Sequence, residues 1–221
     1  LKYSIMASIL KVDKIRVTGA DSDSISFDGS GNITFNKTAS GAGMNVIVQN
    51  DTTGGTANEI AFDLSMDTSY IFQRFIITGM YSSHTNDLYA RTRRASDNSY
   101  YTGSNSYGWG YRYVTSGGTG GSGSNGATYG RFCGHGMGNV IGEISTYIVD
   151  VYNNAVSGSG KETTLHWQRY GISGSDVYCN EDGHVMETAT TTTNQFKLYS
   201  SAGGGSTITY DGYVHYGFKR S

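Results

Sequence analysis

The stretch Y-I-F-Q-R-F-I-I-T-G-M-Y-S-S-H-T-N-D-L-Y-A-R-T-R-R, from Tyr70 to Arg94, is the most apolar segment of the chain and decides its fold. It predicts a strand over Tyr70–Met80, a polar turn over Ser82–Asp87 and a second strand over Leu88–Arg94. In the second strand, tyrosine and arginine alternate with small or apolar residues, so the two kinds of side chain lie on opposite faces. The first strand is expected to be buried on both faces. We therefore predict a hairpin at the centre of a β-sandwich.

The composition extends this prediction to the whole chain. Its 221 residues include 32 glycines and 18 tyrosines but no proline, and only 15% are charged. Glycine, serine, threonine and tyrosine suit short strands joined by tight turns, and no run of ten residues shows helical apolar spacing. Hydrophobic residues make up 37%, which allows a thin core and suggests that partner subunits supply further burial. The expected fold is all-β, a jelly-roll-like β-sandwich with a short N-terminal β arm.

The first forty residues hold few large apolar side chains and are predicted to form a separate attachment arm. Ser8–Val17 alternates like an amphipathic strand, and D-G-S-G at 28–31 is a hairpin signal. A-S-G-A-G at 39–43 is the expected hinge. The chain is therefore divided into an arm, residues 1–43, and a sandwich body, residues 44–221. Attachment is assigned to the apolar residues of the first strand, which are Leu10, Val12, Ile15 and Val17.

Eight or so strands would fit the predicted sandwich, and ten segments of the body are candidates. Besides the two of the opening stretch, they are Met44–Gln49, Asn58–Met66, Ser99–Val114, Gly142–Tyr152, Thr163–Tyr170, Gly174–Cys179, Gln195–Ser200 and Gly212–Lys219. The segment Ser116–Gly126, S-G-G-T-G-G-S-G-S-N-G, has low complexity. It is predicted to be a loop that is mobile or held by a neighbour.

Charge and hydropathy exclude two classes of partner. The net charge of −2 gives no drive towards nucleic acid or an anionic membrane. No stretch approaches the ~20 apolar residues of a membrane span, and the apolar run near the N-terminus is too short for a signal peptide. Met6-Ala7-Ser8 resembles an ordinary start, so residues 1–5 come from an upstream start or the chain is processed. We expect neither nucleic-acid binding nor membrane insertion.

Three segments together resemble a known class of protein. They are M-A-S-I-L-K-V-D-K-I (Met6–Ile15), F-Q-R-F-I-I-T-G-M-Y…L-Y-A-R-T-R-R-A-S-D…Y-Y-T-G-S-N-S-Y-G-W-G-Y (Phe72–Tyr111) and F-K-L-Y-S-S-A-G-G-G-S-T-I-T…Y-G-F-K (Phe196–Lys219). The combination resembles virion surface proteins of tailed bacteriophages, particularly those of marine bacteria, of the tail fibre, head fibre or capsid decoration type. The resemblance implies a homotrimer whose N-terminal segment docks on the virion while the β-sandwich faces outward. It implies no enzyme chemistry and no cofactor.

Four aromatic residues alternate along one predicted strand and so share a face: Tyr107, Trp109, Tyr111 and Tyr113. Sugars stack on such rings, and nearby Asn and Ser side chains supply hydrogen bonds. The alternative, which we favour, is that the rings fill the core or a trimer interface. Arg91 and Arg93, with Arg94, form a basic group that suits an acidic virion subunit or an anionic host glycan. This group is too small and isolated to bind nucleic acid.

A calcium loop is a further candidate. Asp21, Asp23 and Asp28 place oxygen ligands near glycines, as Ca²⁺ loops do. The closing glutamate of an EF-hand is missing, and the same residues make plain turns, which is the interpretation we favour. No metal is therefore assigned.

Cysteine and histidine give a second metal candidate. His135 lies near Cys133, and Cys179 with His184 would complete a four-ligand site. None of the histidines has the spacing of a zinc pair, and two cysteines do not define a disulfide framework. The favoured interpretation is isolated histidines and two small buried thiols. The five histidines are His84, His135, His166, His184 and His215.

Hydrolysis of polysaccharide needs two carboxylates ~5–9.5 Å apart. Asp150, Glu143 and Asp176 are candidates, but no pattern links any two of them. We therefore predict no enzyme. The expected function is a structural component of the virion surface, a capsid decoration protein or short fibre, with itself, capsid or tail proteins and a host-surface glycan as partners. The alternatives are a receptor-binding tail fibre and a free carbohydrate-binding, lectin-like module.

Overall fold

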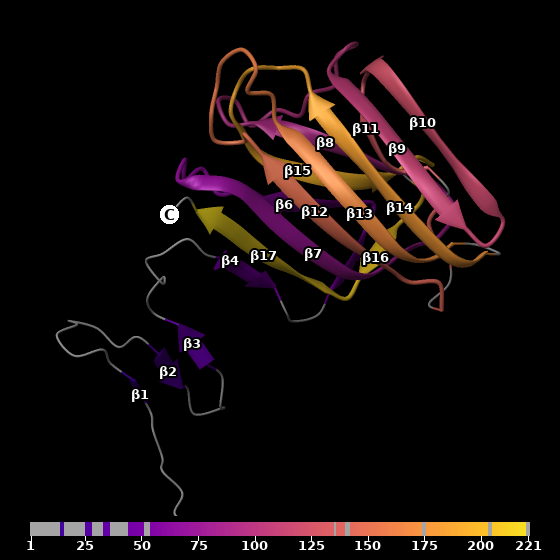
Figure 1. Cartoon of the computed structure of the whole chain (residues 1–221), viewed down its shortest axis with the longest axis horizontal. Coiled ribbons are helices and arrows are strands. Elements are labelled where there is room, and N and C mark those ends of the chain that lie inside the picture. Colours follow the sequence, from indigo (N-terminus) through magenta and orange to yellow (C-terminus); the bar gives the residue numbers. More distant parts are fainter. Residues whose placement is uncertain are drawn as a thin grey trace, which may run out of the picture. The chain divides into compact units, whose positions relative to one another are not determined.

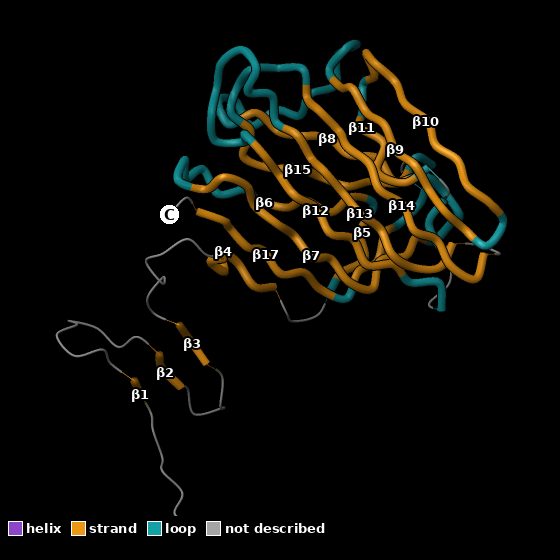
Figure 2. The backbone as a smooth tube through the Cα atoms, in the orientation of Figure 1, coloured by secondary structure: helices purple, strands orange, loops and turns teal. Residues whose placement is uncertain are grey.

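A computed structural model describes residues 54–134, 136–139, 142–173, 176–202 and 205–219. The side chains of residues 173, 176 and 177 are not part of this description. Before residue 54, only the backbone of the strands is described. The chain divides into two compact units, Leu1–Gly41 and Ala42–Ser221. Throughout the described residues the regular elements are strands and none is a helix (Figure 1, Figure 2). The prediction of an all-β chain is confirmed.

The first unit contains a three-stranded antiparallel sheet. Its strands β1 (Lys14–Ile15), β2 (Ile25–Phe27) and β3 (Ile33–Phe35) lie in that order. β2 and β3 pair around D-G-S-G, which confirms the predicted hairpin. Of the assigned attachment residues, Leu10, Val12 and Val17 lie outside the described residues, as does the side chain of Ile15.

The second unit is built on a large antiparallel sheet in which β10, β9, β14, β13, β12 and β7 follow one another. Beyond β7 the sheet continues through β17 to β4 and, at the end of β7, through β16 to β5. These strands are β4 (Met44–Asn50), β5 (Gly55–Ala57), β7 (Tyr70–Ser82), β9 (Tyr107–Thr115), β10 (Gly118–Ala127), β12 (Ser145–Tyr152), β13 (Thr164–Ser173), β14 (Asp176–Glu187), β16 (Ile208–Tyr210) and β17 (Gly212–Lys219).

A smaller sheet packs against one face of the large sheet, and the two enclose an aromatic core (Figure 1). Phe196 stacks on Phe62 at 4.9 Å between ring centroids and meets Phe75 of the large sheet edge-on at 5.1 Å. Phe132 stacks on Trp167 at 5.5 Å. In order, the smaller sheet consists of β11 (Gly130–Cys133), β8 (Leu88–Arg94), β15 (Thr193–Ser200) and β6 (Glu59–Asp63). The predicted β-sandwich is confirmed, while its jelly-roll connectivity stays a prediction.

The two strands of the opening stretch do not form a hairpin, contrary to the prediction. β7 pairs with β12, β16 and β17, whereas β8 pairs with β11 and β15 in the other sheet. Residues 83–87 therefore cross between the sheets. The edges of β7 are occupied by strands from later in the sequence, so β8 has no place beside it. One face of β7 is buried, and the other, which carries Arg74 and Ile76, is half-buried. The prediction that this strand is buried on both faces was therefore also wrong.

The glycine-rich segment that was predicted to be a loop is strand β10, at one edge of the large sheet. It pairs with β9 along its whole length. A backbone ladder needs no side chains, and here bulk is excluded, because a Cβ on Gly121 would lie 2.5 Å from the backbone oxygen of Tyr111. The low complexity of β10 therefore reflects close packing against an aromatic strand.

Candidate functional site

The aromatic stripe of β9 faces inward. Tyr107 is fully buried and Trp109 is 9% exposed. Trp109, Tyr111 and Tyr113 stack in succession, with ring centroids 5.9 and 6.4 Å apart, and the guanidinium of Arg131 lies 5.2 Å from the Tyr111 centroid. Tyr107 and Trp109 are therefore core residues and are not available to a glycan, which corrects that alternative for these two rings. Tyr111 and Tyr113 are half-buried.

Two members of the predicted basic group, Arg91 and Arg93, lie on the outer face of the smaller sheet, which we call the tyrosine–arginine face, while Arg94 pairs with Asp97 and lies over the Tyr101 ring. Tyr89 stacks on Tyr129 at 4.0 Å between centroids and meets Tyr199 edge-on at 5.8 Å. Arg91 lies over the Tyr199 ring at 5.1 Å. The face consists of Tyr89, Arg91, Arg93, Tyr129, Lys197 and Tyr199.

Two of the three cations on the tyrosine–arginine face pair with carboxylates of the neighbouring strand β6. Lys197 lies 2.6 Å from the Glu59 carboxylate, and Arg93 lies 3.8 Å from that of Asp63. Arg91 donates to a backbone carbonyl and has no carboxylate at ion-pair distance among the described residues. Contact of Arg91 and Arg93 with a glycan or another subunit stays a prediction.

The core contains an ion pair that the sequence analysis missed. Arg169 of β13 donates to Glu181 of β14 at 2.9 Å, and neither side chain is exposed. Arg169 also donates to the carbonyl of Gly136 at 2.8 Å and to Ser145 Oγ and Cys133 Sγ, each at 3.0 Å. These bonds replace the hydration that a buried charge loses.

Both cysteines are free and fully buried, which confirms the interpretation of two buried thiols. Burial raises the pKa of the Cys133 thiol far above its ordinary value, although the positive charge of Arg169 opposes the shift. A nucleophilic or metal-binding cysteine must be a thiolate. Cys133 is therefore held as a protonated thiol.

A second buried acid, Glu187, lies at the end of β14 among hydroxyl groups. Its Oε2 accepts hydrogen bonds from Thr92 at 2.5 Å and from Thr193 at 3.0 Å. The hydroxyl of Tyr107 lies 3.2 Å from Thr92 Oγ1 and completes the cluster. Burial raises the pKa of Glu187, and the hydrogen bonds only partly oppose this. Glu187 therefore holds its proton more tightly than an exposed glutamate does.

The histidines are dispersed. His166 and His184 lie opposite each other on neighbouring strands of the large sheet, while His215 is buried on β17. Within the described residues, no three His, Cys, Asp or Glu side chains are grouped as a metal ion requires. Other parts of the two metal candidates lie outside the described residues, namely His135, Asp21, Asp23 and Asp28.

The candidate carboxylates for hydrolysis have separate partners. Asp150 accepts two hydrogen bonds from Arg74, at 2.6 and 2.7 Å. Glu143 accepts from the backbone N–H of Asn139 at 2.8 Å. The side chain of Asp176 lies outside the described residues.

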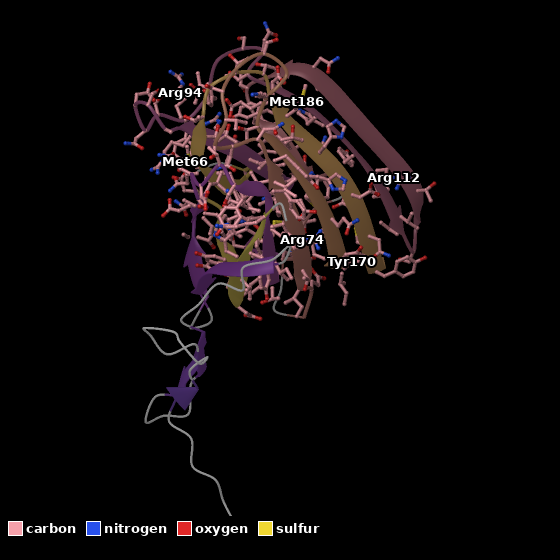
Figure 3. The ribbon with its side chains drawn as sticks, turned by 60° about the vertical axis from the view of Figure 1, so that its left-hand side comes forward. Met66, Arg74, Arg94, Arg112, Tyr170 and Met186 are labelled. Atoms are coloured by element: carbon pink, nitrogen blue, oxygen red, sulfur yellow. The ribbon has the colours of Figure 1, made fainter. Side chains whose placement is uncertain are left out.

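A shallow groove of about 400 Å³ lies on the outer face of β9, β13 and β14. Arg112 pairs with Asp182 there at 2.6 Å, and Tyr170 is 47% exposed beside them. Figure 3 labels Arg112 and Tyr170 on this side of the sandwich. Because the cation of this groove already has a carboxylate partner, it offers a ligand no free charge.

A larger groove, of about 810 Å³, lies between the turn before β7 and the loop after β12, and we call it the Lys161 groove. β7 and β12, which carry Tyr70, Ile71 and Tyr152 of its lining, are neighbours in the sheet, so paired strands support both walls. Sequence patterns gave no sign of it, because its two walls come from distant parts of the chain. Its lining is Thr68, Ser69, Tyr70, Ile71, Tyr152, Asn153, Asn154, Ala155, Val156, Lys161 and Thr164.

Comparison with known proteins does not assign the chain to a family. No family model matches the chain, and no curated protein and no solved structure matches it. The described residues include no helix that is long and apolar enough to cross a membrane.

Proposed function

We propose that this chain is a non-enzymatic structural component of a tailed-bacteriophage virion, exposed on the particle as a capsid decoration protein or short fibre. The observation that carries the proposal is the division into two compact units of unequal size, Leu1–Gly41 and Ala42–Ser221. A small unit that attaches and a large sandwich that faces outward need this division. The resemblance of three segments to phage surface proteins supports the same role.

The interior of the sandwich supports a structural role. Its fully buried charges, Arg169 and Glu181, neutralise each other. Burial raises the pKa of the Cys133 thiol, which keeps it protonated, and it also raises the pKa of Glu187. Such groups stabilise and specify a scaffold.

A homotrimer is part of the proposal. Large apolar side chains are exposed on the outer face of the large sheet, between 40% and 48% of their surface. Val114 and Tyr170 lie on either side of Asn180 in the sheet, and exposed apolar side chains that gather in this way mark contacts between proteins. A neighbouring copy or a capsid subunit covers this face in the proposed assembly. The residues are Val114, Tyr170, Tyr178 and Met186, of which Figure 3 labels Tyr170 and Met186.

Two measurements test this proposal. Light scattering of the purified chain should give the mass of three copies, and a monomer would count against the trimer. Gold-labelled antibodies raised against the sandwich should label intact particles purified from the source of the sequence. Peptides of the chain should also remain with those particles through a density gradient. Consistent absence from the particles would overturn the virion role.

A further inference from the structure

The two walls of the Lys161 groove are tied together by buried amides. Gln73 donates to the carbonyl of Ser65 at 2.7 Å and to Asn154 Oδ1 at 2.8 Å, and it accepts from the Ser65 N–H. Asn154 in turn donates to the Ser65 carbonyl at 2.9 Å. Ser65 precedes one wall and Asn154 belongs to the other. The groove is therefore preformed, which lowers the entropic cost of binding a ligand.

Two tyrosines supply aromatic surface in the groove. Tyr70 and Tyr152 are half-buried, and Tyr152 packs on Phe72 with ring centroids 5.3 Å apart. Lys219 lies over the Tyr70 ring at 4.8 Å. Among the described residues, the structure gives neither phenolic oxygen a hydrogen-bond partner. Each ring offers a flat apolar face and a polar tip to a bound molecule.

Lys161 brings an uncompensated positive charge to the groove. It is exposed, and no carboxylate lies at ion-pair distance from it in the described part of the chain. The neighbouring Glu162 accepts from the N–H of Gly160 instead, and Asp67 pairs with Lys219. Eight other basic residues do have carboxylate partners: Arg74, Arg93, Arg94, Arg112, Arg131, Arg169, Lys197 and Lys219. Lys161 therefore differs from these eight residues, because it has no carboxylate partner in the described part of the chain.

The rest of the lining supplies short polar groups. Thr68, Ser69 and Thr164 carry hydroxyls, and Asn153 carries an amide in a loop residue with φ of 61°. Ile71, 45% exposed, and Val156 add apolar surface. Stacking rings, hydroxyls, an amide and one free ammonium are complementary to a molecule with sugar rings, many hydroxyls and a negative charge.

We propose that the Lys161 groove binds an acidic oligosaccharide. The sugar rings stack on Tyr70 and Tyr152, their hydroxyls bond to the short polar side chains, and Lys161 holds the carboxylate or sulfate group. The anion selects the ligand, because neutral sugars leave the ammonium without a partner. This inference concerns binding by the chain itself and stands apart from the virion role.

Isothermal titration of the full chain tests the inference. The probes are an oligomer of uronic acid, a sulfated oligosaccharide and a neutral oligosaccharide of matched length. At least one acidic probe should bind, with the neutral probe at least about tenfold weaker, as expected for loss of one charge-assisted contact. The acidic probe that binds better identifies the anionic group. Absence of binding by both acidic probes, or equal binding of all three, would overturn the inference.

Matched variants assign the binding to this groove. Lys161→Gln should weaken the acidic ligand about tenfold and leave the neutral probe unchanged. Arg91→Gln removes the other basic charge without a carboxylate partner in the described residues, on the tyrosine–arginine face, and should bind as the parent does. Both positions are at the surface, and equal melting temperatures would show that both variants fold. A Lys161→Gln variant that binds as tightly as the parent would contradict the proposal, whatever the location of the chain on particles.

Discussion

Glu181 and Glu187 lie on one face of one strand, β14, and both are buried, yet they are accommodated differently. Glu181 has a full positive charge beside it, since Arg169 donates to it at 2.9 Å. Glu187 has hydroxyl donors, Thr92 and Thr193, and one of its oxygens has no partner among the described residues. The same side chain thus faces a positive charge in one half of the core and only hydroxyl donors in the other, where burial raises its pKa.

The two sites show that this core accommodates a buried carboxyl group in two ways. An ion pair inside a protein offsets its desolvation only while both partners and their hydrogen bonds are present. The hydroxyl cluster around Glu187 contains no opposite charge whose removal could strand the acid. Burial instead raises the pKa of Glu187. The Arg169 site should therefore be sensitive to removal of one charge, and the Glu187 site should be sensitive mainly to pH.

The largest effect is expected from Glu181→Gln. This change leaves the guanidinium of Arg169 buried without its counter-charge, which should cost about 3–5 kcal/mol of unfolding free energy. Urea unfolding near neutral pH, followed by tryptophan fluorescence, measures it. A loss below about 1 kcal/mol would mean that the hydrogen bonds of Arg169 to Gly136, Ser145 and Cys133 suffice without the carboxylate.

The matched control removes both charges. Arg169→Met combined with Glu181→Leu should be much more stable than Glu181→Gln, because apolar residues of similar volume often replace a buried ion pair without loss. If the double variant is as unstable as the single one, the packing of the two side chains matters more than their charge.

His215 extends the comparison to a buried base, because burial lowers its pKa whereas burial raises that of Glu187. Burial lowers the pKa of His215 to about 4, and Nδ1 has no partner among the described residues, so protonation would bury an unpaired N–H. The unfolded chain takes up this proton at its ordinary pKa of 6.5, so stability is lost as pH falls from there to about 4. The loss should be about 3 kcal/mol.

Unfolding free energies measured across this pH range test the prediction. His215→Gln should flatten the profile between about pH 6.5 and 4, because glutamine carries no titrating group but still reaches Gln73 as a donor. A variant with the same slope as the parent would show that other groups cause the acid sensitivity.

Strands with regular alternation were predicted well from the sequence. The predicted Leu88–Arg94 and Gly212–Lys219 coincide with β8 and β17, because period two is a local property. The partners of β7 were not predictable in this way, since pairing is decided by residues far along the chain. β10 was missed because its ladder is backbone only, and glycine and serine leave no periodic signal.

The buried ion pair had a signal that went unused. In T-L-H-W-Q-R-Y, Arg169 is in register with Leu165 and Trp167, so the alternation places it on the apolar face. Glu181 is likewise in register with Val185 on the next strand. A charged residue on an apolar face predicts a buried charge that needs a partner. The walls of the Lys161 groove carry no such signal, because loops have no period.

A smaller effect is expected from Thr92→Val. This change removes a hydroxyl that donates to Glu187 at 2.5 Å and leaves a buried acceptor without that donor, at a cost of about 1–3 kcal/mol. Thr92→Ser keeps the hydroxyl and serves as the control, with the larger part of the stability retained. Urea unfolding of both near neutral pH measures the difference. Equal stability of the valine and serine variants would mean that the hydroxyl group at position 92 does not stabilise the buried Glu187.

The smallest effect at mildly acidic pH is expected from Glu187→Gln. This substitution is also the most direct test of the contrast between Glu181 and Glu187. Because burial raises the pKa of Glu187, the folded chain holds this proton more tightly than the unfolded chain. Its contribution to stability is full below the ordinary pKa of 4.5 and is lost as pH rises through the raised value. Glutamine mimics the protonated acid, so the variant should lie within about 1 kcal/mol of the parent near pH 4 and gain on it as pH rises.

Unfolding of both proteins in a series of buffers from about pH 4 to 8 measures this gain. His215 contributes equally to parent and variant, so the difference between the two curves isolates the acid. A gap that stays constant with pH would mean that Glu187 is ionised in the core without penalty. The hydroxyls of Thr92 and Thr193 would then solvate a carboxylate as well as Arg169 does, and the two acids of β14 would not differ in kind.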